Sequence, residues 1–151
     1  MPAYFFDASA LVKAYIHEPG SKWVRQVLGR QVTKAFISPL SGAEVLAAIT
    51  RKERLRELDL TTRDRVAAAF RKDYRRRFAH TALDASVIEE AMALVLSHPL
   101  RGYDAVQLAS ALILPAASPQ VRPLFFVSAD AVLLRVARQT GLATENPADH
   151  P

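Results

Sequence analysis

The sequence contains no cysteine, and this absence excludes disulfide bonds, thiolate zinc sites, iron–sulfur clusters and a cysteine nucleophile. No run of apolar residues approaches the roughly 18 that a membrane-spanning helix needs. The N-terminus has no basic segment, and Asp7 comes too early for the apolar core of a signal peptide. The four histidines are scattered, with no spacing typical of metal ligands. We therefore expect a cytoplasmic protein without a membrane segment.

What is present is the composition of an ordinary globular chain, with half of the residues hydrophobic and 23% charged. A chain of this length buries roughly 70% of its unfolded surface, so its core needs no covalent support. No internal repeat is visible. We expect one domain over residues 1–151, with a basic helical arm at 51–79 and a polar tail at 145–151.

The positive charge is concentrated in one segment. The net charge is +5, and residues 51–77 hold eleven lysines and arginines against five acids. The other residues carry nine basic and ten acidic side chains, so this segment supplies the whole excess. Arginine dominates it, and a guanidinium group suits phosphate better than an ammonium group does. Two interpretations stay open: a solvated helical face with internal ion pairs, or an arm that binds a polyanion.

Short apolar segments alternate with amphipathic ones along the chain. The predicted strands are 3–6, 35–37, 81–83, 124–127 and 142–144. The predicted helices are 9–16, 21–28, 40–57, 61–78, 87–95, 103–114 and 131–140. Strands that are continuously apolar and alternate with helices predict an α/β fold of three layers, with a central parallel sheet of four to five strands flanked by helices. In such sheets ligands bind beyond the carboxyl ends of the strands.

Residues that typically begin or end helices set the expected helix boundaries. Thr61 and Thr62 are expected to cap the helix that follows them, and Ser21 to cap the second helix. Gly141 is a typical residue to follow the C-terminus of the last helix. The proline-containing loop 115–119 is expected to close the apolar helix before it.

Two acids follow predicted buried strands directly. Asp7 comes after the first strand, and Asp130 comes just after the strand at 124–127. Both therefore lie at the edge of the sheet where ligands bind. Each also precedes a helix, so each is open to the alternative interpretation that it is only a helix N-cap.

Two other acids interrupt apolar helix stripes. Glu44 shares a stripe with Ala47 and Ala48, and Asp104 shares one with Leu108. A buried carboxylate needs a partner or a raised pKa, because desolvation disfavours its charge. The alternatives are that Glu44 pairs with an arginine and that Asp104 is the N-terminal acid of its helix.

Together the four acids are expected to face one crevice. Like charges about 4 Å apart repel by roughly 4 kcal/mol at an effective dielectric constant of 20, so such a cluster needs shared protons or a cation. An all-oxygen set of ligands selects Mg²⁺ or Mn²⁺ and leaves room for water and a substrate phosphate.

These residues resemble the PIN-domain ribonucleases, and most closely the VapC-type toxins of prokaryotic toxin–antitoxin pairs. The matching stretches are FDASALVK at 6–13, EPGS at 18–21, SPLS at 38–41, EVLAA at 44–48 with Arg51, DAVQLASA at 104–111, and FVSAD at 126–130. The resemblance covers nearly the whole chain. It departs from the family at Gln107, where relatives often carry histidine, and in a longer, proline-rich loop at 115–123.

The resemblance implies a compact parallel sheet, a homodimer and a metal-dependent endoribonuclease. It implies that Asp7, Glu44 and Asp104 hold Mg²⁺ or Mn²⁺, and that Asp130 holds a second ion or positions a water. Ser9 and Ser128 match residues that support the site by hydrogen bonding. The implied partners are the RNA substrate and a cognate antitoxin protein. In this scheme the arm binds RNA phosphates, with candidate contacts at Arg51, Arg54, Arg75, Arg76 and Arg77.

Three other classes of protein are alternatives to this hypothesis. A phosphorelay receiver domain needs an acidic pair after the first strand, and Asp7 has no acidic neighbour. A haloacid-dehalogenase-type phosphatase needs a second aspartate two residues later, where Ser9 stands. The remaining alternative is a catalytically silent module of the same fold that binds RNA or an antitoxin.

Overall fold

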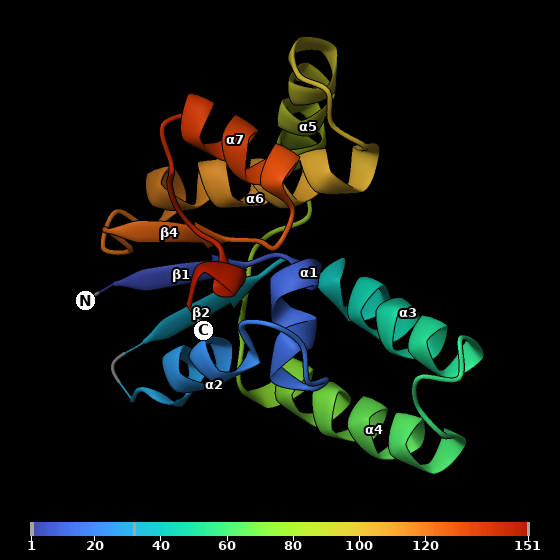
Figure 1. Cartoon of the computed structure of the whole chain (residues 1–151). Coiled ribbons are helices and arrows are strands. Elements are labelled where there is room, and N and C mark those ends of the chain that lie inside the picture. Colours follow the sequence, from blue (N-terminus) through green and yellow to red (C-terminus); the bar gives the residue numbers. More distant parts are fainter. Residues whose placement is uncertain (1, 32, 151) are drawn as a thin grey trace.

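The computed structural model describes residues 2–31 and 33–150. Its centre is a five-stranded sheet in the order β3-β2-β1-β4-β5, and Figure 1 labels the three central strands β2, β1 and β4. Every neighbouring pair of strands is parallel. The strands are β1 (Ala3–Phe6), β2 (Lys34–Ile37), β3 (Ala79–His80), β4 (Leu124–Val127) and β5 (Ala143–Glu145). The predicted parallel sheet flanked by helices is confirmed.

Helices cover both faces of this sheet (Figure 1). One face carries α1 (Ala8–Leu11), the 3-10 turn η1 (Val12–Ala14), α2 (Ser21–Gly29), α3 (Ser41–Arg54) and α4 (Leu60–Arg76). The other carries α5 (Ala85–Ser97), α6 (Gly102–Ala117) and α7 (Ala131–Gln139). A short 3-10 turn, η2 (Pro147–Asp149), lies near the C-terminus, where Trp23 of α2 stacks on His150 with ring centroids 4.4 Å apart.

Alternation along the central strands divides the interior into two cores. Tyr4 and Phe6 point into the core beneath α1–α4, whereas Ala3 and Phe5 point into the core beneath α5–α7. Side chains at successive strand positions point to opposite faces, so a strand that is buried throughout must be apolar on both. This is why the run at 3–6 has no polar residue.

Several predicted boundaries are wrong, each for a local reason. The predicted helix at 9–16 divides into α1 and η1, and the helix predicted to reach 57 ends at Arg54. Asp59, rather than Thr61 or Thr62, caps α4, because its carboxylate accepts the Thr62 N–H at 2.6 Å. The helix α6 continues past Pro115 to Ala117, with the Ser118 N–H donating to Leu114.

Of three further expectations about the ends of elements, one is wrong, one is shifted along the chain and one is confirmed. Ser21 does not cap α2: its hydroxyl accepts the Glu18 N–H and donates to the Ile16 carbonyl. The weak strand predicted at 81–83 is found two residues earlier, as β3. Gly141 follows α7 as predicted, with φ +95, a conformation that side chains with a Cβ rarely adopt.

The topology creates a switch point beside the first strand. The chain begins in the middle of the sheet with β1, extends to one side through β2 and β3, and then crosses to β4 on the other side of β1. The connections after β1 and β4 therefore diverge at the carboxyl edge, which leaves a crevice between them. Among the described residues, no helix is long and apolar enough to cross a membrane.

Candidate functional site

The carboxylate of Asp7 lies at this crevice and is only 4% exposed. Its Oδ1 accepts hydrogen bonds from the Ser9 hydroxyl at 2.7 Å and from the Ala10 N–H at 2.9 Å. Its Oδ2 accepts one from the Ser128 hydroxyl at 2.6 Å. Ser9 lies in α1, which follows β1, and Ser128 lies in the loop after β4, so the two hydroxyl groups fix both oxygens of the Asp7 carboxylate.

Burial raises the pKa of Asp7 to about 6. The hydrogen bonds from Ser128, Ala10 and Ser9 oppose this shift, and the nearby charge of Asp104 adds to it. A group whose charge is this costly to bury gains from a cation beside it.

Asp7 and Asp130 are helix N-caps as well as groove residues. Asp7 caps α1, and Oδ1 of Asp130 caps α7 by accepting the N–H groups of Val132 and Leu133 at 2.9 and 3.1 Å. The alternative interpretation, that both residues are helix N-caps, is therefore confirmed. The cap uses only Oδ1 of Asp130, and Oδ2 of Asp130 lies 4.0 Å from Arg101 Nη2.

Glu44, in the first turn of α3, is held by an amide rather than by an arginine. Gln107 of α6 is 1% exposed, and its Nε2 donates to Glu44 Oε2 at 3.1 Å and to the Ser41 hydroxyl at 3.0 Å. Among the side chains that the structure describes, two buried oxygens have no hydrogen-bond partner: Oε1 of Glu44 and Oε1 of Gln107. Unpartnered buried acceptors are costly, so the groove wall offers two oxygens to a water or a cation.

The environment also makes the charge of Glu44 costly. Burial raises the pKa of Glu44 to about 7, the Gln107 hydrogen bond opposes this, and the charges of Asp7 and Asp104 add to it. Three acids on three different elements therefore interact through space, as expected if they share one crevice.

Asp104 is the first-turn acid of α6, as the alternative interpretation of this residue proposed. Its Oδ2 accepts a hydrogen bond from Arg101 Nε at 3.2 Å. A negative side chain in the first turn also interacts favourably with the helix dipole. Asp104 thus has a structural role and lines the groove at the same time.

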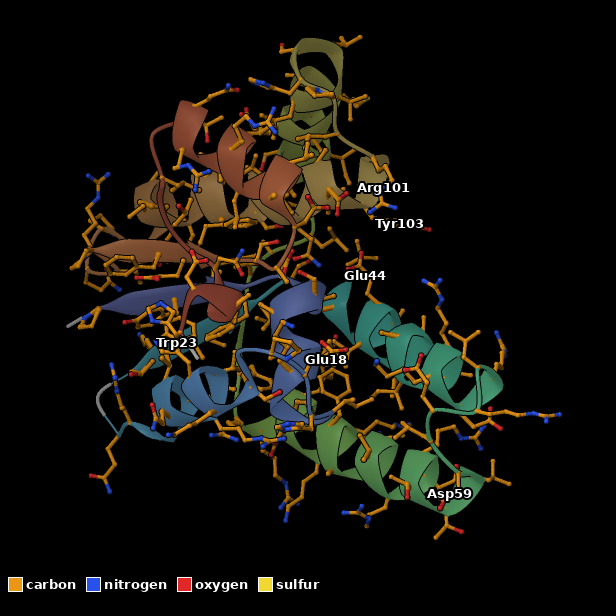
Figure 2. The ribbon with its side chains drawn as sticks, viewed as in Figure 1. Glu18, Trp23, Glu44, Asp59, Arg101 and Tyr103 are labelled. Carbon is orange, nitrogen blue, oxygen red and sulfur yellow. The ribbon has the colours of Figure 1, made fainter. Side chains whose placement is uncertain are left out.

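The acids line one groove of about 430 Å³. Figure 2 shows Glu44 at the start of α3 facing Arg101 and Tyr103 at the start of α6. The lining residues come from α1, η1, α3 and α6 and from the positions directly before α1, α6 and α7: Asp7, Ala8, Ser9, Val12, Glu44, Ala47, Ala48, Arg101, Tyr103, Asp104, Gln107 and Asp130.

The donor set of this groove fits Mg²⁺ or Mn²⁺. The available ligands are carboxylate oxygens, with no histidine or cysteine beside them, and Glu44 Oε1 is buried without a partner. Within residues 2–31 and 33–150, however, no three acids or histidines yet converge closely enough to hold an ion.

The arginines of the predicted arm divide between two places. Arg51 and Arg54 are exposed on α3, and Arg51 lies one turn beyond Ala47 and Ala48 of the acidic groove. Arg75 and Arg76 of α4 line a different groove, together with Arg71 and Lys72. Arg77 has a structural role, because its guanidinium donates to the Leu28 carbonyl at 2.8 Å and pairs with Asp73.

Sequence reasoning missed four residues of the site: Ser41, Arg101, Tyr103 and Gln107. Gln107 had a usable signal, because it lies three residues after Asp104 and so shares its face of α6. Arg101 had a similar one, three residues before Asp104. Ser41 had none, since its contact with Gln107 joins two helices 66 positions apart.

Comparisons with known proteins agree with this geometry. The family model described as PIN domain matches residues 4–139. Ribonuclease VapC45 of Mycobacterium tuberculosis (strain CDC 1551 / Oshkosh) is 39% identical over 114 residues, which cover 74% of this chain and 76% of that protein. Ribonuclease VapC49 of the strain ATCC 25618 / H37Rv matches to the same extent. The chain therefore belongs to the PIN-domain family.

Solved structures share the fold at low sequence identity. PAE2754 from Pyrobaculum aerophilum matches with a TM-score of 0.62 and 23% identity, over 98% of this chain and 91% of that one. VapBC2 from Rickettsia felis, solved with a DNA fragment from its promoter, matches with a TM-score of 0.62 and 12% identity, over 95% of this chain and 98% of that one.

Proposed function

We propose that this protein is a metal-dependent endoribonuclease and the toxin of a type II toxin–antitoxin pair. The observation that carries the proposal is a single groove at the switch point of the sheet, lined by Asp7, Glu44, Asp104 and Asp130. The relatives that are 39% identical are named ribonucleases, which supports hydrolysis of RNA.

In this proposal Asp7, Glu44 and Asp104 hold Mg²⁺ or Mn²⁺, and Asp130 holds a second ion or orients a water. A bound ion would lower the pKa of a water molecule and neutralise charge on the scissile phosphodiester. Ser9 and Ser128 keep both oxygens of Asp7 in position through bonds of 2.7 and 2.6 Å. Gln107 does the same for one oxygen of Glu44 and leaves the other one available.

The exposed arginines supply the RNA contacts outside the acidic groove. Arg51 and Arg54 on α3, and Arg75 and Arg76 on α4, would bind phosphates on either side of the cleaved bond. Such contacts make affinity depend strongly on salt. Arg77 contributes less in this proposal, because its side chain is already bonded to Leu28 and Asp73.

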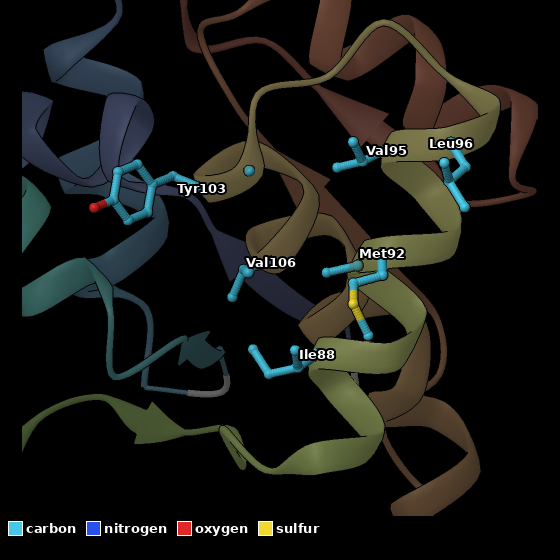
Figure 3. Close-up of a pocket in the computed structure, with 8 residues that line it drawn as sticks. Ile88, Met92, Val95, Leu96, Tyr103 and Val106 are labelled. Atoms are coloured by element: carbon cyan, nitrogen blue, oxygen red, sulfur yellow. The ribbon is translucent and has the colours of Figure 1, made fainter.

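Two protein partners belong to the proposal. One is a cognate antitoxin, since VapBC2 of Rickettsia felis and VapBC-1 of nontypeable Haemophilus influenzae share this fold. The other is a second copy of this chain, docked on the apolar groove between α5 and α6 (Figure 3). That groove has no charged lining residue to select an oppositely charged partner, and symmetric dimers pair a surface with itself.

The experiment is cleavage of a mixed pool of structured RNAs by purified protein with saturating Mn²⁺ or with a chelator, beside Asp7→Asn. Wild-type protein is expected to cleave only with metal. The variant should lose at least about 100-fold in rate, because loss of a metal ligand exceeds the 10–100-fold effect of outer-shell changes. Equal cleavage by both proteins in Mn²⁺ would contradict the proposal.

The silent-module alternative gives a different pattern in the same experiment. It expects that the wild-type protein binds the RNA pool without cleaving it and binds no Mn²⁺. Binding of Mn²⁺ without cleavage would instead indicate a ribonuclease whose specific target is absent from the pool.

A further inference from the structure

Arg101 occupies an unusual position in the acidic groove. It is the residue directly before α6, and its Nε donates to Asp104 Oδ2 at 3.2 Å. Its Nη2 lies 4.0 Å from Asp130 Oδ2. Its charge also acts on Glu44, where it partly opposes the rise in pKa that burial causes. One guanidinium group therefore interacts with three of the four acids.

Among the described residues that line this groove, Arg101 is the one basic side chain. It stands between Asp104 and Asp130, where a metal ion would otherwise neutralise both. This placement gives a physical reason why the acids do not converge on one point: Asp104 is turned toward Arg101.

The ion pairs of Arg101 with Asp104 and Asp130 are weak. Its side chain is 83% exposed, and exposed ion pairs contribute little because water screens them. Arg101 makes no side-chain cap for α6, so the helix does not depend on its guanidinium group. The side chain is therefore free to turn outward when a stronger cation arrives.

We propose that Arg101 is the residue of this site that binds a substrate phosphate, and that Asp104 and Asp130 hold it in reserve until a metal ion replaces it. The inference rests on the proposed ribonuclease function and adds a substrate contact to it. Asp104 and Asp130 would hold a divalent ion, whose charge would neutralise Asp104 and repel the guanidinium group at the same time. The group then presents its planar set of N–H donors, which matches two phosphate oxygens, at the rim of the groove.

The position of Arg51 gives this contact a counterpart. Arg51 is exposed one turn beyond Ala47 and Ala48 on the α3 wall, while Arg101 begins the α6 wall opposite. An RNA strand that crosses the groove would meet one arginine on each side of the acids. Its scissile phosphate would then lie over the metal ligands.

The first experiment measures metal binding without RNA, by calorimetric titration of Mn²⁺. Arg101→Gln is compared with wild type and with Arg30→Gln, which removes an exposed arginine at the end of α2, before β2 and at the opposite edge of the sheet. Removal of a competing cation should tighten Mn²⁺ binding roughly threefold in Arg101→Gln, and Arg30→Gln should match wild type. Weaker or unchanged binding in Arg101→Gln overturns the inference.

The second experiment measures binding of a labelled, mixed-sequence single-stranded RNA by fluorescence anisotropy at several salt concentrations. The anisotropy is extrapolated to the time of mixing, before any RNA is cleaved. With Mn²⁺, Arg101→Gln should lower the salt dependence of log Kd by about 0.7, the value for one lost phosphate contact on a single strand. With a chelator the difference in slope between the variant and wild type should be smaller, because Arg101 then pairs with Asp104 and Asp130 for part of the time. Equal slopes with Mn²⁺, or a difference that is as large with the chelator as with Mn²⁺, overturn the inference.

Failure of the inference and failure of the proposed function look different. If wild type binds Mn²⁺ and cleaves RNA while Arg101→Gln behaves as Arg30→Gln does, only the role of Arg101 is wrong. If wild type neither binds Mn²⁺ nor cleaves RNA, the ribonuclease proposal is wrong, and the role of Arg101 falls with it.

Discussion

Asp7 combines two roles that compete for one carboxylate. Its Oδ1 caps α1, and its Oδ2 receives the Ser128 hydroxyl, so the side chain cannot rotate away from the groove. Burial raises its pKa to about 6 from the ordinary 3.8, which means that its charge destabilises the metal-free fold. The cost of burying this charge also makes Asp7 a good metal ligand, because a cation beside the carboxylate offsets that cost.

The pH dependence of stability follows from this shift. As pH rises from about 4 to about 6, the unfolded chain releases the Asp7 proton before the folded chain does, so the free energy of unfolding falls. In Asp7→Asn this loss is absent, and asparagine is as good an N-cap as aspartate. With a chelator present, denaturant unfolding should find the variant about equal to wild type near pH 4 and on the order of 2 kcal/mol more stable at pH 8.

Addition of Mn²⁺ serves as the control for this prediction. At pH 8 the ion should raise the stability of wild type and leave Asp7→Asn nearly unchanged. A variant that is less stable than wild type at pH 8 without metal would show that the charge of Asp7 is accommodated by the fold alone.

At this scale the sequence predicted positions better than interactions. Asp7 and Asp130 were predicted as site residues because they follow apolar strands, and Glu44 and Asp104 because they interrupt apolar stripes; all four line one groove. The partner of Glu44 was not found, because Gln107 reaches it only through the packing of α6 against α3. Such a contact depends on the relative placement of two helices that are far apart in sequence.

At the scale of elements, α5 leaves part of its apolar surface uncovered. Leu96 is 89% exposed, Met92 49% and Val95 42%, and together with Tyr103 of α6 they line a groove of about 560 Å³ (Figure 3). Exposed apolar patches of this kind mark interaction surfaces. The proposed homodimer gives this surface a partner.

The dimer prediction is tested by a charge on α5. Met92→Glu places a carboxylate in the apolar groove, where burial in an interface would strip it of water, so dimerisation should weaken at least about 10-fold. Leu55→Glu is the matched control, because Leu55 is 58% exposed and follows α3 on the other side of the sheet. Sedimentation analysis should find a dimer for wild type and Leu55→Glu and a monomer for Met92→Glu. Equal masses for all three proteins would contradict this interface.

The extents of elements show where sequence patterns stop being informative. The aromatic strand β1 was predicted with correct bounds because its whole length is buried. The strand β3 has only two residues and was predicted at 81–83, since its position is set by pairing with β2 and not by its own composition. Pro115 was expected to end α6, but the helix continues for two residues beyond it.

At the scale of the whole molecule, the order of the strands creates the site. Because β1 lies between β2 and β4, the loops after β1 and β4 bring Asp7 and Asp130 to one edge, and α3 and α6 reach the same edge with Glu44 and Asp104. The sequence predicted the parallel sheet and the edge at which ligands bind. It could not predict the strand order itself, which depends on which side of β1 the later crossover takes.

The most direct test of the account is a Mn²⁺ titration of RNA cleavage by Asp104→Asn beside Asp64→Asn. Asp104 lines the groove, whereas Asp64 is an exposed acid of α4 that pairs with Arg63. We predict metal-dependent cleavage by wild type and Asp64→Asn, and loss of both cleavage and tight Mn²⁺ binding in Asp104→Asn. Full activity of Asp104→Asn with unchanged Mn²⁺ affinity would contradict the claim that the four acids form one metal-dependent site.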